Sequence, residues 1–195
     1  MSFSLSEVDI VNHALVELGA QTISSLSASA PQAVASNAIY NHTRRELLRK
    51  SAWNFALVKI ELGQSTDVPI FDYQYKYALP SDCLRVWKVY GDSDFKVVGG
   101  YIESNLSSCK LEYVKDETDP NRWDSLFTQL MMASIKAKLT YNLTKSTSAK
   151  AEAYNELARL LKEAKFIDSS EDIQDDYAKY DNALVNARLY DEGTW

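Results

Sequence analysis

Hydrophobic positions near the N-terminus are spaced for an amphipathic helix. Between residues 5 and 18, apolar side chains recur every three or four positions, which places them on one face of an α-helix. Ser4 is expected to cap this helix, and Glu7, three residues later, completes the pattern of a capping box. Gly19 follows the last apolar position, where a glycine commonly ends a helix in the left-handed conformation.

A second helix is predicted after a Ser/Ala-rich connector, from Pro31 in the first helical position to about Ser51. A row of basic side chains on such a helix is usually a solvated face. The alternative is a contact surface for another protein subunit. The candidate partner-binding residues in this basic cluster are Arg44, Arg45, Arg49 and Lys50.

The hydrophobic period changes after the aromatic sequence Trp53-Asn54-Phe55. From Val58 to Leu62, apolar and charged side chains alternate, as they do on a half-buried strand. Trp53 and Phe55 therefore lie where a helical layer meets a β layer. We expect both aromatic side chains to pack in the core, because large aromatics in such positions are mostly buried.

Short strand-like runs continue as far as Val114. The expected strands cover residues 73–79, 83–90, 95–98, 101–103 and 109–114. Gly99-Gly100 separates two of these runs and predicts a hairpin with a primed turn. Nine aromatic residues lie between Phe71 and Tyr113. That density suits a small sheet or barrel with a core of large side chains, and it equally suits an aromatic contact face.

Two more helices are predicted beyond this region. Asp119-Pro120 supplies an N-cap and a first-turn proline for a third helix of about 24 residues. The Ser-Thr-Ser sequence at 146–148 ends that helix and caps a fourth, which is expected to stop at the Asp-Ser-Ser sequence 168–170. The apolar stripe of the fourth helix consists of Ala153, Leu157, Leu160, Ala164 and Ile167.

These predictions amount to an α+β fold: an antiparallel helical bundle with an inserted small antiparallel β subdomain and a C-terminal arm. The N-terminal helices of the bundle are expected within residues 1–56 and its C-terminal helices within 119–168. The β subdomain is expected at 57–118, and the acidic arm at 169–195.

The charge of the chain is unevenly distributed. The net charge is −6, and residues 166–195 alone carry eight acidic and two basic side chains, so the first 165 residues hold 19 of each sign. A neutral body with an acidic end argues against a general nucleic-acid binder. It favours a basic protein partner, or a surface that must not adhere to DNA.

The acidic segment also has an apolar stripe and ends in large apolar residues. Such a helix is marginal by itself and suits a groove on a basic partner, so we expect it to dock as an arm on a neighbouring chain. The alternative is a fifth helix packed on its own bundle. The candidate partner-binding residues of the arm are Tyr177, Tyr180, Leu184, Arg188, Tyr190 and Trp195.

Patterns that would indicate catalysis are missing from the sequence. It contains no GxSxG, P-loop or GxGxxG pattern. His13 and His42 lie on different predicted helices, with no carboxylate or cysteine expected at ligand spacing. Glu112, on an aromatic-flanked strand, is the strongest candidate for an unusual acid, although some carboxylate pair arises by chance among 27 acidic residues. We expect no catalytic residue, no metal and no cofactor.

The compartment is addressed by three further expectations. The N-terminus lacks the basic start of a signal peptide, and no apolar run reaches the roughly 20 residues that span a bilayer. A membrane partner is not expected. Cys83 and Cys109 are far apart in the chain, and we expect them to be reduced thiols.

Several stretches together resemble the tail tubular protein A family, the head-to-tail adaptors of short-tailed bacteriophages. The resemblance extends in order over about residues 8–165, and the pattern W-N-F-A followed by Y-x-L-P-x-D-C-L-R-V is its most specific part. The matching stretches are NHALVELG (12–19), the Ile23/Leu26 connector, RRELLRKSAWNFA (44–56), YKYALPSDCLRV (75–86), LEY (111–113) and the helical run from Trp123.

This resemblance implies a structural protein of the virion, assembled in the host cytoplasm. Members of the family form a ring, typically of twelve copies, between the portal protein and a tail nozzle similar to tail tubular protein B. Genome DNA passes through the ring without specific binding. The resemblance thus implies an adaptor without enzymatic activity, in which the basic cluster contacts another subunit or the portal.

Two other functions stay open at this level. One is a tail-associated hydrolase of glycan or peptidoglycan, which would need a carboxylate pair. The other is a DNA-binding module, which fits the basic cluster but not the acidic balance of the chain.

Overall fold

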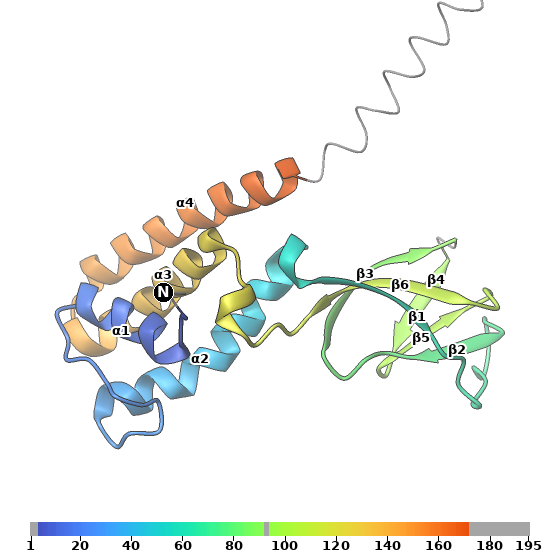
Figure 1. Ribbon diagram of the computed structural model, residues 1–195, viewed down its shortest axis with the longest axis horizontal. Helices are drawn as coiled ribbons and strands as arrows, with labels where there is room; N and C mark the ends of the chain where they lie inside the picture. Colours follow the sequence, from blue (N-terminus) through green and yellow to red (C-terminus); the bar gives the residue numbers. More distant parts are fainter. Residues whose placement is uncertain (1–3, 92–93, 172–195) are drawn as a thin grey trace, which may run out of the picture.

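The computed structural model describes residues 4–91 and 94–171 and consists of a helical part and a β part that projects from it (Figure 1). The helical part comprises residues 4–56 and 119–171, and the β part comprises residues 57–118, without 92 and 93. The helices are α1 (Glu7–Glu17), α2 (Pro31–Lys50), α3 (Ser125–Thr144) and α4 (Thr147–Glu171), with short 3₁₀ turns η1 (Asn54–Ala56) and η2 (Pro120–Arg122). The strands are β1 (Leu57–Leu62), β2 (Tyr75–Ala78), β3 (Cys83–Tyr90), β4 (Phe95–Val98), β5 (Tyr101–Ser104) and β6 (Cys109–Lys115). The expectation of a mixed helix and sheet protein is confirmed.

Helix α3 lies at the centre of the helical part and contacts α1, α2 and α4. Apolar side chains are buried around most of its circumference, as in a helix that is covered on several sides. The largest of them are Phe127, Leu130, Met131, Ile135 and Leu139. Helix α4 covers one side of this core and buries little more than Ala153 and Ala164, while Leu157 and Leu160 are partly buried, as the predicted stripe requires. The last position of that stripe, Ile167, is instead exposed.

Helix α1 begins two residues later than predicted. Its N-cap is Ser6, and the capping box pairs Ser6 with Asp9 rather than Ser4 with Glu7. The Leu5 amide donates to the Asn121 side chain at 2.9 Å, which fixes the chain before Ser6 in a non-helical position. At the other end Gly19 has φ +67°, and the amide of Ala20 reaches back to the Leu15 carbonyl, so the predicted glycine stop is confirmed.

The third helix also begins later than expected. Asp119 caps only the 3₁₀ turn η2, and α3 starts after a second cap at Asp124. Between the two caps, Trp123 turns inward and its indole nitrogen donates to the Glu117 carbonyl at 3.1 Å. The predicted single helix from Pro120 is therefore wrong, because this irregular stretch separates η2 from α3.

Helix α4 continues through the Asp-Ser-Ser sequence that was expected to end it. The hydroxyls of Ser169 and Ser170 donate to the carbonyls of Phe166 and Ile167, three residues back, so these side chains are satisfied inside the helix. The predicted helix break at 168–170 is therefore wrong, and the acidic arm itself stays a prediction. The six arm candidates, Tyr177, Tyr180, Leu184, Arg188, Tyr190 and Trp195, lie outside the described residues.

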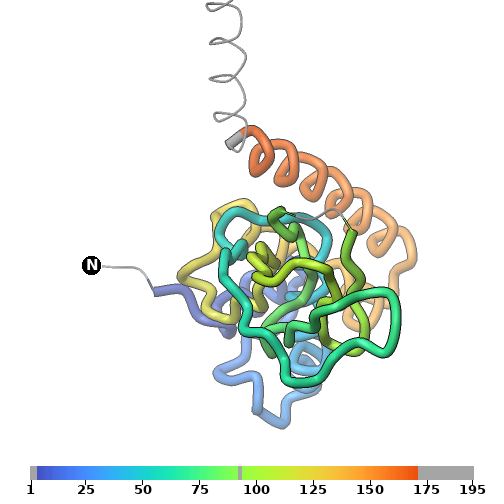
Figure 2. Tube along the Cα trace, turned by 90° about the vertical axis from the view of Figure 1, so that its right-hand side faces the viewer, coloured from blue at the N-terminus to red at the C-terminus, as the bar shows by residue number. Residues whose placement is uncertain are grey.

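The β part consists of two antiparallel three-stranded sheets, ordered β1-β6-β3 and β2-β5-β4. The predicted strands are confirmed, with the run 73–79 shortened to β2. Gly99 and Gly100 both have positive φ, +56° and +84°, which is the geometry of a primed hairpin turn. Viewed from the β end, the sheets stand in front of the helices, and α4 passes along one side (Figure 2).

The aromatic residues of the β part divide between a core and its surface. The core between the sheets is formed by Tyr77, Val89, Ile102, Cys109, Leu111 and Tyr113. Trp87 and Phe71 are exposed. The prediction of a core of large side chains is confirmed for Tyr77 and Tyr113, whereas an aromatic contact face stays a prediction.

Two other expectations about the chain can be assessed. Cys83 and Cys109 are free thiols, and burial raises the pKa of each. Among residues 4–91 and 94–171, no helix combines the length and the apolar character needed to cross a membrane.

Candidate functional site

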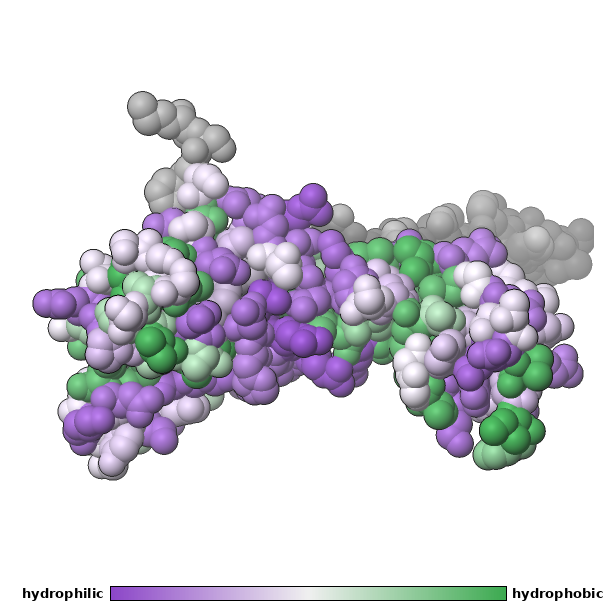
Figure 3. Space-filling view, turned by 90° about the horizontal axis from the view of Figure 1, so that it is seen from below, coloured by the Kyte–Doolittle hydropathy of each residue, from purple (hydrophilic) through white to green (hydrophobic). Residues whose placement is uncertain are grey.

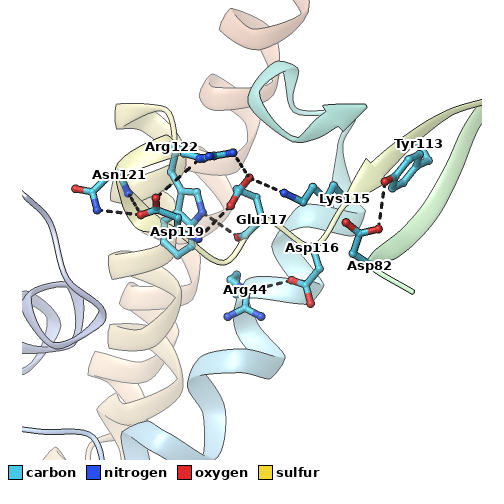
Figure 4. Close-up of polar contacts among 10 residues, drawn as sticks. Arg44, Asp82, Tyr113, Lys115, Asp116, Glu117, Asp119, Asn121 and Arg122 are labelled. Atoms are coloured by element: carbon cyan, nitrogen blue, oxygen red, sulfur yellow. Dashed lines mark hydrogen bonds and ion pairs between the residues drawn. The ribbon is translucent and has the colours of Figure 1, made fainter. Parts of the chain in front are cut away.

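The junction between the two parts holds a dense set of charged side chains (Figure 4). Helix α2 supplies arginines from one side, and the segment that follows β6 supplies carboxylates from the other. The loop before β3 also reaches this place, because the Asp116 amide donates to the Asp82 carbonyl at 2.8 Å. Three stretches far apart in the sequence thus meet here.

Arg44 is the most buried of these charged residues, with 5% of its surface exposed. Its Nε donates to Asp116 Oδ1 at 3.1 Å, and its Nη1 donates to Asn41 Oδ1 at 2.6 Å. Arg45 Nε lies 3.4 Å from the other Asp116 oxygen. One carboxylate therefore holds two arginines of α2, and a buried charge pair of this kind is costly to break on one side only.

The end of α2 is joined to the start of β3. An Arg49 guanidinium nitrogen donates to the Leu84 carbonyl, and Arg85 Nη1 donates to the Arg49 carbonyl at 3.3 Å. Lys50 pairs with Glu46 at 2.9 Å on its own helix. Glu46 also accepts a hydrogen bond from Lys138 of α3, and these two cations, Lys138 first, lower the pKa of Glu46 to about 2.

The basic cluster predicted from the sequence is therefore divided. The usual interpretation, a solvated helix face, is wrong for Arg44, because that side chain is buried against Asp116. It agrees with Arg45, whose side chain is 58% exposed. The role of the cluster in binding a partner stays a prediction, now for the exposed Arg45, Arg49 and Lys50.

The return crossing from the β part is fixed by Glu117, which is itself buried. Its Oε2 accepts from Lys115 at 3.2 Å and lies 3.7 Å from Arg122 Nη1. Its other oxygen accepts from the Asp119 amide at 3.2 Å. Asp119 accepts in turn from Asn121, which lowers its pKa.

On the sheet side of the junction, the Tyr113 hydroxyl donates to Asp82 at 3.1 Å. Burial, and then the nearby Asp82 carboxylate, raise the pKa of Tyr113 to about 12. This contact ties β6 to the loop that precedes β3. The phenol therefore stays protonated and donating at any physiological pH.

An aromatic corner closes the helical side of the junction. Trp53 is 1% exposed, its indole nitrogen donates to the Leu47 carbonyl at 2.9 Å, and its ring meets Phe127 edge-on at 5.2 Å. Phe55 is partly buried and lies 4.9 Å from the same phenylalanine ring. The expected core role of both aromatics is confirmed.

Glu112 and His13, two of the candidates singled out from the sequence, have structural partners. Glu112 accepts from the Tyr90 hydroxyl at 2.6 Å and lies 3.7 Å from Lys59 Nζ. His13 lies 3.4 Å from Glu17, so a carboxylate does lie one helical turn away from it, contrary to expectation. In the part of the chain that the structure describes, no group of three or more His, Cys, Asp or Glu residues could hold a metal ion.

A carboxylate pair does converge elsewhere, which sequence reasoning missed. Lys136 of α3 lies 2.9 Å from both Glu17 of α1 and Glu156 of α4. These two carboxylates, Glu17 first, raise the pKa of Lys136. The lysine between them neutralises the pair and binds three helices together, so the arrangement is suited to holding the fold rather than to general acid–base chemistry.

Sequence reasoning also missed the two main anchors of the junction, Asp116 and Glu117. They lie in a short run that looked like a plain break between a strand and a helix. One signal in the sequence could have identified them: Asp116 and Glu117 follow a predicted strand, and neither was expected to cap a helix or form a turn.

Comparison with models of known protein families finds none that matches this chain, and a search of curated proteins finds no match either.

Proposed function

We propose that the chain is a head-to-tail adaptor similar to tail tubular protein A, forming a ring between the portal and the tail nozzle of a short-tailed phage. The observation that carries this proposal is the composition of the junction. Stretches 44–56, 75–86 and 111–113, on which the resemblance rests, all supply contacts there, among them those made by Arg44, Asp82 and Tyr113.

The junction gives a physical reason why such a set of residues suits an adaptor. A subunit of a closed ring must offer two different faces at a fixed angle, since a small error in rotation prevents closure. The Arg44–Asp116 ion pair joins α2 to the segment after β6, and hydrogen bonds from the Arg49 and Arg85 side chains to backbone carbonyls join α2 to β3, so the β part is held firmly relative to the helices. An adaptor subunit with such a rigid junction can hold two partners in a fixed orientation relative to one another.

The finer architecture belongs to the same proposal. The helices form an antiparallel bundle, and residues 172–195 form an acidic arm that docks on the portal. Arg45 and Lys50 contact a neighbouring subunit or the portal rather than DNA. A channel through which DNA slides should avoid strong phosphate pairing, because each neutralised phosphate adds affinity by counterion release.

The proposal is tested by mixing the purified chain with the portal protein from the same genome and measuring the mass of the product by mass photometry. We expect one ring of copies, roughly twelve, on each portal assembly. A chain that ends at Glu171 keeps all of the described elements and is expected to lose this binding. Arg159→Glu is the matched control for the charge-reversal variant Arg45→Glu considered next, because Arg159 is an exposed residue of α4 that lies away from the junction.

A wild-type chain that does not bind the portal at any ratio would contradict the adaptor function. A truncated chain that binds at full strength would contradict the arm alone. Arg44 is unsuitable for a binding test, because removing it leaves Asp116 with only its long contact to Arg45. Arg45→Glu avoids this difficulty and is expected to weaken ring or portal assembly.

A further inference from the structure

The free end of the β part presents an apolar loop to solvent. The loop joins β1 to β2 and covers residues 63–74. Ile70 is 94% exposed and Phe71 is 68% exposed, and Val68 is exposed beside them. In the space-filling view from below, a hydrophobic group protrudes from this end of the molecule (Figure 3). Exposed apolar groups of this kind indicate an interaction surface.

The loop is held in place at its base. Gln64 forms a bridge with Tyr77, and the Ser65 amide donates to the Lys76 carbonyl at 2.8 Å. On the other side, the Gln74 amide donates to Asn105 Oδ1 at 3.1 Å. These bonds fix both ends of the loop, so its apolar tip projects from a defined place.

The tip is acidic at both sides. Asp67 and Asp72 flank the apolar residues, and residues 63–74 contain no lysine or arginine. The tip is thus an apolar wedge with a charge of −2. These carboxylates argue against insertion into an anionic lipid surface, which attracts basic segments.

A shallow hollow of about 360 Å³ lies on the outer face of the sheet β1-β6-β3. It is lined by Lys59, Ile60, Glu61, Tyr90, Lys110 and Leu111. Its volume lies within the range of protein pockets that bind small molecules.

The hollow has an aromatic wall and a basic rim. The Tyr90 ring is fixed by its hydroxyl bond to Glu112 and by Lys88, whose Nζ lies 4.8 Å from the ring centre. The acids of this face are Glu112, which accepts from the Tyr90 hydroxyl and lies 3.7 Å from Lys59, and Glu61, which accepts from the Ser108 hydroxyl. Three lysines, Lys59, Lys88 and Lys110, thus stand against two carboxylates, so the excess charge that an incoming group would meet is positive.

We infer that the tip at Val68–Phe71 of one copy docks in the lysine-rimmed hollow of the next copy. The inference rests on the ring proposed above and names the contact that builds it. Apolar and charged features match: an apolar wedge between two carboxylates meets an apolar hollow with three lysines around it. Because the tip and the hollow are different surfaces of one chain, the contact is heterologous and can repeat around a ring.

The test uses the full chain and two variants that each remove one half of the contact. The tip variant is Ile70→Ser with Phe71→Ser, and the hollow variant is Lys59→Ser with Lys110→Ser. Phe166→Ser, at 73% exposure, is the control for the tip, and Lys162→Ser on the exposed side of α4 is the control for the hollow. The readout is mass against protein concentration, up to the solubility limit.

The wild-type chain and both controls are expected to form assemblies larger than two copies. Each variant alone should need at least about tenfold more protein to assemble. A mixture of the two variants keeps one intact tip and one intact hollow for each pair. It should therefore give a two-copy species, and this species should weaken as salt screens the lysine–aspartate attraction.

Several results would overturn the contact. These are a wild-type chain that stays monomeric, a tip variant that assembles like wild type, or a mixture that does not pair. Assembly that is lost on removing 172–195 but kept in the tip variant would assign the hollow to the acidic arm. Portal binding separates the two proposals: a tip variant that still forms a full ring on the portal overturns the contact and leaves the adaptor function standing.

Discussion

At the junction, the buried Arg44 is paired with the partly buried Asp116, whereas at the free end of the β part Ile70 and Phe71 are exposed to solvent. The first region buries groups that prefer water, and the second exposes groups that avoid it. A buried charge is tolerated only when it is paired, so the junction is a place where the chain is complete by itself. The free end has the opposite character, because its apolar groups gain most from a contact that the single chain does not supply.

This difference predicts which property a substitution changes in each region: the stability of the chain or its association with other chains. Substitution of the buried Arg44, or of its partner Asp116, should act on the stability of the chain, because both members of that pair lie within the chain. Substitution at the tip should act on association and leave the stability of the chain unchanged. Three predictions examine this separation.

The largest effect is expected for Asp116→Ala. The substitution leaves Arg44 buried without its carboxylate, and it should lower the free energy of unfolding by about 3–5 kcal/mol. Asp67→Ala, at the tip, removes an exposed carboxylate and should change it by less than about 0.5 kcal/mol. Chemical denaturation with circular dichroism gives both values.

A double variant refines this result. Arg44→Met together with Asp116→Leu removes both charges and should recover most of the stability that Asp116→Ala loses, because no unpaired buried charge is left. A double variant no more stable than Asp116→Ala alone would show that the pair acts through shape or through Arg45. Equal effects of Asp116→Ala and Asp67→Ala would abolish the distinction between the two regions.

Much of the fold can be predicted from the sequence, for reasons that are local. The strands are short apolar runs, several of them next to a Gly or Pro, and most were placed to within two residues of their observed ends. The starts of α1 and α3 were misplaced because two possible N-caps lie within a few residues of each other. These are Ser4 and Ser6 for α1, and Asp119 and Asp124 for α3. Distant contacts decide between them, and these have no trace in the local pattern.

The contacts of the junction could not be predicted from the sequence, for a related reason. Arg44 and Asp116 are 72 positions apart, and nothing local distinguishes Arg44 from the exposed Arg45 beside it. The helical period places a residue on a face, but a buried arginine depends on a carboxylate supplied from another element. The basic cluster was therefore recognised as a group although its members have different environments.

A smaller effect contrasts two isoleucines of the β part. Ile102 is fully buried between the sheets, and Ile102→Ala should cost about 2–4 kcal/mol of unfolding free energy through lost contacts and a cavity. Ile70→Ala should cost less than about 0.5 kcal/mol, because that side chain makes few contacts within the chain. Thermal unfolding at low protein concentration measures both without a contribution from assembly. A large loss for Ile70→Ala would mean that the tip is part of the fold, and it would weaken the case for the docking contact.

The smallest effect concerns Glu46, which lies between the two extremes because its charges are paired but its side chain is 38% exposed. The lysines beside it lower the pKa of Glu46 to about 2 from an ordinary value of 4.5. A carboxyl whose pKa is lower in the folded chain stabilises that chain above the unfolded pKa, and this stabilisation is lost as the pH falls through the folded pKa. Because solvent screens a partly exposed pair, we expect Glu46→Gln to cost less than about 1 kcal/mol at pH 7. The difference from wild type should shrink as the pH falls from 4.5 towards 2. Glu163→Gln, on the exposed side of α4, is the matched control and should show little difference at any pH. A Glu46→Gln penalty that stays constant down to pH 2 would mean that the side chain acts through packing and not through its charge.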